Sequence, residues 1–412
     1  PRLIARAAGR SDMLGVLFIN LDRFKTINDA MGHSVGDLML KSVARRITEA
    51  LRPLDQVYRQ GGDEFIAVLP EISGAGDAGH VAERILEAIT RPIHEAGLDL
   101  HTAATIGIAL FPGDGADAET LLRNADTAMY AAKARGGSSC HFFSEQMNER
   151  LQRRVALEAA LRNAVSAGQM ELHYQPQVNV ADGRIVGAEA LLRWRHEGRL
   201  IPPDHFIPVA EETGMIHTIG EWVLDTAISQ AARWHADCAS APRLAINLSP
   251  RQFWHSGLAR GIIQRLQGHR LPAESIELEV TESVLIQPEG PAIGELRALR
   301  QHGLHLALDD FGTGYSSLSY LRNLPVNRLK IDKSFIFPLA GQRAENPQDA
   351  AAIVRAIIAM AHSLSLSVVA EGVETAAHLH TLKVMGCDLY QGYLLSPALP
   401  ADQFAANFLR PA

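Results

Sequence analysis

The chain has 412 residues, of which 47% are hydrophobic and 21% charged, and its formal net charge is −7 at pH 7. A chain of this length is too long to fold around one ordinary hydrophobic core, so two domains of about 150 to 250 residues each are expected. The negative charge, without any lysine- or arginine-rich run, argues against a protein that binds duplex nucleic acid. No apolar run approaches the roughly 20 residues that a membrane span needs.

The ends of the chain and its cysteines indicate where the protein works. The chain begins at Pro1, without an initiator methionine, and shows no signal peptide. Cys140, Cys238 and Cys387 are far apart and form no CxxC pair, so we expect free thiols in a reducing cytoplasm. We therefore expect a cytoplasmic fragment whose upstream sensory region, with or without a membrane anchor, is absent from it.

The first third of the chain is predicted to contain a charged hairpin among strands and helices. Its elements, in chain order, are a buried strand at 15–21, a helical segment from Asp22 interrupted at 31–37, a helix at 38–51, and strands at 56–60 and 66–69. Gly61 and Gly62 form the turn between the last two strands, and Asp63 and Glu64 follow. Such charges are usually solvated, but glycines also allow a nucleotide to approach the backbone closely.

The motifs of this region resemble the GGDEF domain of the diguanylate cyclase family. The signature GGDEF stands at 61–65, FKTIND at 24–29 and GHSVGD at 32–37. The resemblance implies a cyclase-like α+β sandwich in which Asn28 and Asp37 hold a guanine edge. Further implied nucleotide-site residues are Asp63 as a metal ligand, Glu64 beside it, Lys133 at the phosphates, and Arg52 with Asp55 as an inhibitory product site.

Two positions depart from this family pattern. Asn20 stands where the family places a metal-binding aspartate, and an amide is a poorer ligand for Mg²⁺ than a carboxylate. Gly137 stands where a phosphate-contacting arginine is expected, four residues after Lys133, although Arg135 lies close by in the sequence. We therefore expect this domain to bind GTP as a regulator, with cyclase activity kept as the alternative.

The second half is predicted to be a closed (β/α) barrel that follows a connecting helix at about 144–167. Beyond residue 168, strand-like and helical segments alternate over about 240 residues, as in such a barrel. The expected strands are 170–174, 185–194, 243–248, 276–280, 304–308, 328–331 and 367–370. The expected helices are 222–236, 257–267, 291–302, 316–323, 350–364 and 375–385. The predicted domains are thus 1–143 and 169–412, joined by a linker at 144–168.

Charged and amide side chains stand at the ends of successive strands of this predicted barrel: Glu189, Asn247, Glu279, Asp309, Asp310, Lys330 and Glu371. One such residue is usually a helix cap or a solvated acid. A series of them is better explained by one rim, because ligands collect at the carboxyl ends of barrel strands. Carboxylate and amide oxygens converging there suit two Mg²⁺ or Mn²⁺ ions and phosphodiester hydrolysis.

This half resembles the EAL domain, a phosphodiesterase family that opens cyclic di-GMP to linear pGpG. The motifs are EALLRW from Glu189, NLS from Asn247, EVTE from Glu279, DDFGTGYSSL from Asp309, KID from Lys330, EGVE from Glu371, and QGY from Gln391. We find no departure at a catalytic position. The whole chain is therefore expected to be an α/β protein, with a GGDEF sandwich followed by a TIM-like EAL barrel.

The EAL resemblance implies a role for each matching residue. One metal would be held by Glu189, Asn247, Glu279 and Asp309, and a second by Asp309, Asp310 and Glu371. The catalytic set is Lys330, Glu371 and Glu189, with Glu282 bracing the loop at 310–318. Substrate contacts are expected from Gln175, Arg193, Asp332 and Gln391.

Three functions remain open at this point. The preferred one is a cyclic di-GMP phosphodiesterase that is regulated by GTP through its N-terminal domain, as a monomer or a homodimer. The alternatives are a bifunctional cyclase and phosphodiesterase, and a cyclic di-GMP receptor without activity. A receptor would be expected to lack metal ligands such as Glu189 or Glu371, and both are present.

Overall fold

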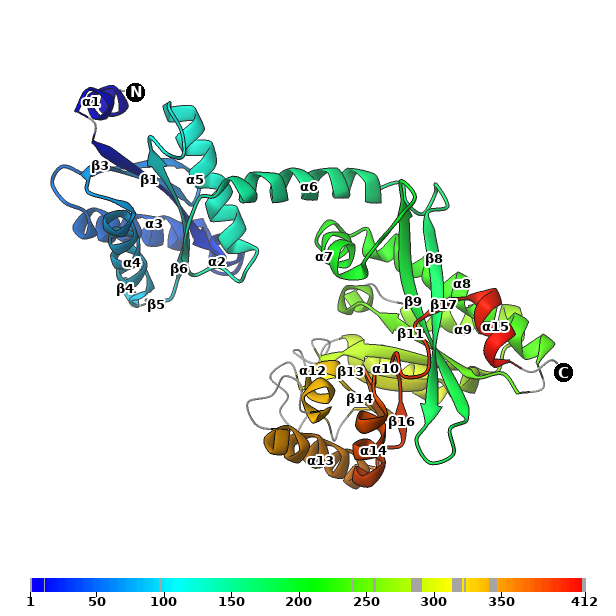
Figure 1. The fold of residues 1–412 in the computed structure, drawn as a ribbon. Helices are drawn as coiled ribbons and strands as arrows, with labels where there is room; N and C mark the ends of the chain where they lie inside the picture. The colour runs from blue at the N-terminus through cyan, green and yellow to red at the C-terminus, as the bar shows by residue number, and fades with distance from the viewer. Residues whose placement is uncertain are drawn as a thin grey trace. The chain divides into compact units, whose positions relative to one another are not determined.

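The structure is a computed structural model that describes residues 2–10, 12–95, 98–238, 240–254, 257–282, 291–312, 321, 324–340 and 347–409. It divides into two compact units, unit 1 up to Ala156 and unit 2 from Leu157 (Figure 1). The division falls inside helix α6 (Glu145–Leu161), which confirms the connecting helix although it ends earlier than expected. The domain limits at 143 and 168 stay predictions. Among the described helices, none combines the length and the apolar character needed to cross a bilayer.

Unit 1 is a five-stranded sheet with helices on both faces. The strands are β1 (Met13–Asp22), β2 (Gln56–Gly61), β3 (Glu64–Ile72), β6 (Ala103–Phe111) and β7 (Cys140–Phe142), in the order β2-β3-β1-β6-β7, with a separate hairpin of β4 (Ile93–Glu95) and β5 (Leu98–Leu100). The helices are α1 (Arg2–Arg10), α2 (Phe24–Met31), α3 (His33–Ala50), α4 (Ala75–Thr90) and α5 (Ala118–Lys133). The α+β sandwich and its β2–β3 hairpin are thereby confirmed.

The central strand β1 is buried on both faces because its side chains alternate between two cores. Leu17, Ile19 and Leu21 belong to the core that α3 and α4 complete. Val16 and Phe18 belong to the core formed with α1 and α5. The same alternation continues to the carboxyl end of β1 and places Asn20 on the α5 side of the sheet.

The interruption predicted at 31–37 exists, but its predicted length is wrong. Helices α2 and α3 are separated by Gly32 alone, and α3 already begins at His33. The φ angle of Gly32 is 84°, a left-handed value that glycine adopts without steric cost. One residue therefore suffices to turn the chain between two helices, so the seven-residue break that the polar and glycine-rich sequence suggested does not form.

Unit 2 is a closed eight-stranded barrel surrounded by helices, which confirms the predicted (β/α) fold. Its strands are β8 (Met170–Asn179), β9 (Ile185–His196), β11 (Arg243–Leu248), β12 (Ile276–Thr281), β13 (His305–Phe311), β14 (Arg328–Ile331), β15 (Ser367–Ala370) and β16 (Leu389–Tyr390), with β10 (Arg199–Ile201) and β17 (Leu399–Pro400) paired outside the ring. Its helices are α7 (Pro203–Thr213), α8 (Ile216–Asp237), α9 (Leu258–His269), α10 (Pro291–Gln301), α12 (Lys333–Ile336), α13 (Pro347–Ser363), α14 (Ala376–Met385) and α15 (Ala401–Phe408).

One strand of the barrel runs against the others. β8 pairs antiparallel with both β9 and β16, and these pairings close the ring. Only residues 180–184 separate β8 from β9. A parallel connection needs a dozen or more residues, so this short link dictates a hairpin. The C-terminal helix α15 lies against β8 (Figure 1). Its Phe404 stacks on Trp234 of α8, with ring centroids 5.0 Å apart.

The strand predicted to end at Leu308 continues to Phe311, so the predicted end is wrong. The register against β14 shifts between Leu308 and Phe311, and Asp310 has a φ of 53°. A bulge of this kind inserts an unpaired residue and redirects its side chain. The two adjacent acids therefore lie within the strand rather than after it. The helix predicted at 316–323 lies almost entirely outside the described residues.

The floor of the barrel contains a buried ion pair. Glu277 is fully buried, and its carboxylate accepts a hydrogen bond of 2.7 Å from Arg328, which is 8% exposed. Arg328 also donates to Ser367 Oγ at 3.2 Å. Glu277 and Arg328 lie two residues before Glu279 and Lys330 on their strands, and residues two apart share one face. The pair therefore forms the layer beneath the site described below.

Breaking this ion pair is expected to destabilise the protein. Replacing Arg328 by methionine keeps much of the volume but leaves a buried carboxylate without its principal partner, which costs about 3 kcal/mol. The double variant Arg328→Met, Glu277→Gln should regain part of this loss, and both are measured by urea denaturation. Arg184→Met is the control, because its ion pair with Asp182 is exposed and worth at most about 1 kcal/mol. A loss in Arg328→Met no larger than that of the control would contradict the expectation.

Candidate functional site

Five carboxylates and one ammonium converge at the carboxyl ends of the barrel strands. They are Glu189 of β9, Glu279 of β12, Asp309 and Asp310 of β13, Lys330 of β14, and Glu371, which directly follows β15. Glu279, Asp309 and Glu371 stand where an apolar strand sequence changes to polar residues, whereas Glu189 lies inside β9 and is followed by apolar residues. The sequence therefore predicted their position at one rim, and the structure brings them together.

Lys330 lies at the centre of this cluster. Its side chain is fully buried, and its Nζ donates a hydrogen bond of 2.6 Å to Glu279 Oε2. The same Nζ lies 2.7 Å from Glu371 Oε1 and 3.1 Å from Asp309 Oδ1. Glu189 Oε2 is 3.4 Å away. One ammonium thus contacts four carboxylates that come from four different strands or strand ends.

The pKa shifts of the charged groups indicate that the cluster carries more negative than positive charge. Burial raises the pKa of Glu371 to about 8, with Asp309 and Glu189 adding to the effect and Lys330 opposing it. Burial and the charge of Glu189 also raise the pKa of Glu279 well above its usual value. Burial alone would lower the pKa of Lys330, but the surrounding carboxylates raise it well above the ordinary range. Additional positive charge would relieve this repulsion.

The cluster offers two carboxylate groups that could each surround a metal ion. One group is Glu189, Glu279 and Asp309, and the other is Asp309, Asp310 and Glu371. Within each group the ligand oxygens lie within 4.8 Å of one another, and Asp309 belongs to both. Oε1 of Glu279 is buried without a hydrogen-bond partner among the described residues. Oxygen ligands, excess charge and an unpaired buried oxygen fit a pair of hard divalent cations.

Two amide side chains hold Glu189 in place, and a third supports one of them. Asn247 donates to its Oε1 at 2.7 Å, and Gln391 donates to its Oε2 at 2.6 Å. Gln391 also donates to Gln175 Oε1 at 3.0 Å, and Gln175 donates to the carbonyl of Ser396 at 3.1 Å. Gln175 and Gln391 are almost fully buried inside the barrel. The structure therefore places both beneath the rim, where Gln391 orients Glu189 and Gln175 orients Gln391.

A cavity of about 510 Å³ opens onto the cluster. Its polar end includes Asn247, Thr281, Asp309 and Asp310. Its other walls are mostly apolar and come from β9, α7 and α8: Ala190, Leu191, Leu192, Pro203, Ile207, Pro208, Ile216, Ile219 and Val223. An apolar cleft that ends in convergent polar groups is the usual form of a small-molecule site.

The remaining predicted residues of unit 2 lie around the site in different ways. Arg193 follows the EAL sequence on β9, is half-buried, and donates to the carbonyl of Leu192 at 2.9 Å. Asp332 caps α12 by accepting from the backbone N–H of Ser334 at 2.9 Å. Both carboxylate oxygens of Glu282 are buried without a partner among the described residues. Most of the loop that Glu282 was predicted to brace, from residue 313 onward, lies outside the described residues.

Two residues of the cavity were not assigned a role from the sequence. Ser249 Oγ donates to Glu211 Oε1 at 2.7 Å, and both line the cavity. Glu211 lies near the end of α7, among polar residues that are typical of a solvated helix face. Its contact with Ser249 joins residues 38 positions apart in the chain, so no local sequence signal indicated it.

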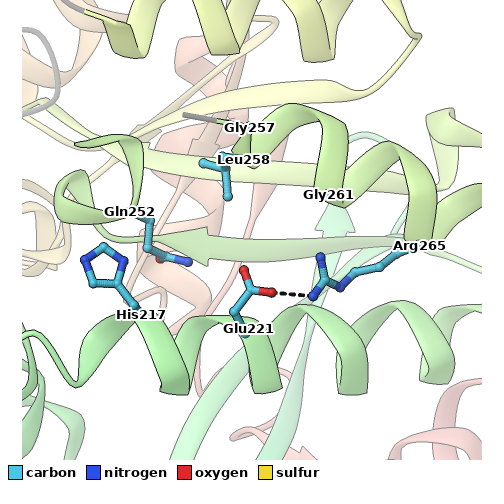
Figure 2. A pocket seen from close by; sticks show the side chains of 7 residues that line it. All are labelled: His217, Glu221, Gln252, Gly257, Leu258, Gly261 and Arg265. Atoms are coloured by element: carbon cyan, nitrogen blue, oxygen red, sulfur yellow. Dashed lines mark hydrogen bonds and ion pairs between the residues drawn. The ribbon is translucent and has the colours of Figure 1, made fainter. Parts of the chain in front are cut away.

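A smaller cavity of about 210 Å³ lies on the outside of the barrel, between α8 and α9 (Figure 2). Glu221 and Arg265 face each other across it and form an ion pair, and Arg265 also contacts Asp225. Its charged groups are thus already engaged with one another. We assign no function to this cavity.

The predicted guanine-reading residues of unit 1 lie on consecutive helices. Asn28 of α2 packs against Gly36 of α3, where a Cβ would come within 1.9 Å of Asn28 Oδ1. This oxygen is buried and has no hydrogen-bond partner among the described residues. Asp37, the next residue of α3, is exposed. Asn28 Oδ1 thus has unused hydrogen-bonding capacity, and the guanine-binding role of the pair stays a prediction.

The predicted metal and phosphate residues of unit 1 meet at the end of β1. Asn20 is 6% exposed, and its Oδ1 accepts a hydrogen bond from Lys133 Nζ at the end of α5. Glu64 lies opposite Asn20 in the β1–β3 register, and the carbonyl of Asp63 accepts from the backbone N–H of Leu21 at 3.2 Å. The hairpin acids thus adjoin Asn20.

The residues predicted to form a product-binding site make a local turn. The backbone N–H of Arg52 donates to Asp55 Oδ2 at 2.8 Å, and the N–H of Asp55 donates to the carbonyl of Arg52 at 3.0 Å. The Arg52 side chain is exposed. The structure therefore shows a preformed turn with an available guanidinium, and the binding role stays a prediction.

Comparison with known proteins identifies two families along the chain. The EAL domain matches residues 158–398, over half of the chain, and the diguanylate cyclase GGDEF domain matches residues 2–139. The bifunctional diguanylate cyclase/cyclic di-GMP phosphodiesterase MucR of Pseudomonas aeruginosa is 44% identical over 397 residues, 95% of this chain and 56% of that protein. The cyclic di-GMP phosphodiesterase PdeR of Escherichia coli is 37% identical over 411 residues, 99% of this chain and 61% of that protein. The chain thus spans little more than half the length of these relatives.

Solved structures agree with the barrel assignment. The phosphodiesterase PaMucR in complex with c-di-GMP has a TM-score of 0.57 and 44% identity, and the match covers 60% of this chain and 99% of that one. The FimX EAL domain of Pseudomonas aeruginosa, bound to c-di-GMP, has a TM-score of 0.53 and 26% identity, covering 59% of this chain and 96% of that one. The chain therefore belongs to the EAL domain family, and a GGDEF domain precedes its EAL domain.

Proposed function

We propose that unit 2 hydrolyses cyclic di-GMP to linear pGpG with Mg²⁺ or Mn²⁺, and that unit 1 binds GTP as a regulator. The observation that carries the first part is the pair of carboxylate groups joined by Asp309, with Lys330 beside both. Two carboxylate groups that share Asp309 are what a hydrolase with two cations requires. The c-di-GMP complexes of related EAL domains support the choice of substrate.

The metal ligands proposed here follow the two carboxylate groups. Glu189, Glu279 and Asp309, with the amide of Asn247, would hold one cation, and Asp309, Asp310 and Glu371 would hold the other. When bound, the cations would supply a nucleophilic hydroxide near neutral pH and offset the charge of the phosphodiester. Gln391 and Asn247 keep both oxygens of Glu189 oriented through their hydrogen bonds.

Lys330 and Arg193 stabilise negative charge and orient the phosphate. The ammonium of Lys330 holds its four carboxylates in place and stabilises the negative charge that develops on the phosphate. Arg193, half-buried beside the cluster, donates to a phosphate oxygen. Water attacks phosphorus, the bond from phosphorus to the 3′ oxygen breaks, and that oxygen takes up a proton. The apolar cavity walls receive a guanine base.

This function is tested by identifying the product that the whole chain forms from cyclic di-GMP. Incubation with cyclic di-GMP and Mg²⁺ or Mn²⁺ should yield pGpG on nucleotide chromatography, and excess EDTA should stop it. Tight binding of cyclic di-GMP without any pGpG would instead indicate the receptor. A separate incubation with GTP tests the bifunctional alternative, which the name of MucR raises and which the contact between Asn20 and Lys133 disfavours.

GTP is expected to raise the rate of cyclic di-GMP hydrolysis. Ligands regulate by binding two arrangements of a protein unequally, and coupling of this kind typically changes affinity or rate by about 5-fold or more. Asn28 and Asp37 provide the guanine-reading groups, so Asp37→Ala should abolish the effect of GTP while leaving the basal rate unchanged. The measurement is the rate of pGpG formation with and without GTP.

Glu87→Ala is the matched control, because Glu87 is an exposed acid on α4 of the same unit. It should respond to GTP as the parent does. An equal GTP response in the parent and in Asp37→Ala would exclude Asp37 as the sensor, and no response in the parent would exclude regulation by GTP.

A further inference from the structure

The nucleotide site of unit 1 does not fit the divalent metal that its family pattern implies. Asn20 provides a neutral amide where a carboxylate is expected, and its oxygen already accepts a hydrogen bond from the ammonium of Lys133. The positive charge at the end of β1 is thus already supplied by the Lys133 side chain. Among the described residues of unit 1, no three histidine, cysteine or acidic side chains could jointly surround an ion.

A carboxylate at the end of β1 itself, that of Asp22, is also engaged. Asp22 accepts a hydrogen bond of 2.8 Å from Thr105 Oγ1 and one of 3.0 Å from the backbone N–H of Ser138. These bonds hold the segment after α5 against the sheet. At Gly137, φ is 71°, and a Cβ would lie 3.1 to 3.3 Å from Thr105 and Asp22. An arginine at this position would therefore be strained, and the site relies on other cationic groups.

A cavity of about 760 Å³ lies beside Lys133. Lys133 and Arg23 both line it, together with Gly136 and Ser138. Thr26 and Ile27 of α2 line it as well, and Asn28 is the next residue of that helix. Arg23 directly precedes α2, and from Phe24 to Asn28 this helix rises about 6 Å, a span comparable to that between the base and the phosphates of a nucleotide. A guanine base held by Asn28 would therefore place the phosphates next to Arg23 and Lys133.

We propose that unit 1 binds GTP without a divalent cation, with the ammonium of Lys133 in the place of the metal. An ammonium has three donors, so Lys133 can keep its bond to Asn20 and still donate to phosphate oxygens. The absence of a carboxylate at position 20 is what leaves this ammonium available to the nucleotide. The inference rests on the proposal that unit 1 binds GTP, and it adds that the regulator works independently of the metals of unit 2.

The test is the affinity of the whole chain for GTP, measured by isothermal titration calorimetry in excess Mg²⁺ and in excess EDTA. In the parent, binding should be at least as tight in EDTA as in Mg²⁺. Lys133→Met should weaken it about 10- to 100-fold in both conditions, the loss expected for hydrogen bonds between charged groups. Asn20→Asp should make binding depend on Mg²⁺, because the new carboxylate neutralises Lys133 and repels the triphosphate.

The controls separate this inference from the function on which it rests. Asp37→Ala should remove the GTP signal, which shows that the signal comes from the guanine site of unit 1. Binding that weakens more than about 10-fold in EDTA would overturn the inference and leave GTP binding by unit 1 intact. No binding in either condition would overturn both. The comparison of the parent in the two conditions needs no variant, so it decides the matter even if Lys133→Met fails to fold.

Discussion

Replacing Glu189 by alanine is expected to lower cyclic di-GMP turnover at least about a thousandfold. Losing a residue that only supports a metal ligand typically costs 10- to 100-fold, and removal of a direct ligand costs more. Glu189 contributes to one of the two carboxylate groups, and Asn247 and Gln391 donate to its two oxygens. Its removal therefore deprives one cation of a ligand and leaves two donors without their acceptor.

The substitution should leave the fold largely intact, because it also removes one charge from a crowded set of carboxylates. The rate is measured as pGpG formation, and folding is measured by thermal denaturation. Glu171→Ala is the control: Glu171 of β8 pairs with Arg195 of β9, and partly exposed ion pairs of this kind contribute little. A Glu189→Ala variant that keeps a tenth of the parent rate or more would remove Glu189 from the metal ligands.

Replacing Lys330 by methionine is expected to lower kcat by about 10²- to 10³-fold and to change KM by less than about 3-fold. Its Nζ lies in the middle of four carboxylates and is fully buried, so it is well placed to stabilise charge that appears only as the phosphodiester reacts. A group of that kind lowers the energy of the transition state more than that of the bound substrate. Methionine retains most of the side-chain volume and thereby limits the effect on packing.

Glu371→Gln should behave in the same way, because the amide has nearly the same shape but lacks the charge. Both variants are assayed at saturating Mg²⁺ or Mn²⁺, so that a weakened hold on the cations is not mistaken for a loss of catalysis. If KM rises while kcat stays near that of the parent, both residues belong to substrate recognition instead. Glu171→Ala again serves as the control for activity.

The order and the type of most elements could be predicted from the sequence, because each depends on neighbouring residues. Strands β11, β14 and β15 match their predicted ranges, since each is a short apolar run bounded by polar residues. The same local change from apolar to charged residues marked Glu279 and Glu371 as rim positions. Closure of the barrel then required only that successive strands pair in order.

The contacts that those rim residues make could not be predicted from the sequence. Lys330 and Glu279 are 51 residues apart, Gln391 and Glu189 are 202 apart, and Lys133 and Asn20 are 113 apart. No periodicity links such pairs, because their contact depends on how strands and helices register in space. The bulge at Asp310 likewise depends on the pairing of β13 with β14, which local propensity does not describe.

The sequence by itself thus determined that unit 2 is a barrel with an acidic rim and that unit 1 carries the GGDEF motif, with Asn20 where the family pattern has an aspartate. Only the tertiary structure decided that one buried ammonium holds four of the rim carboxylates and that Lys133 reaches Asn20. The physical reason is that strand ends and helix faces are encoded locally. Which charges meet across a closed barrel or a sheet is set by packing between segments that are distant in the chain.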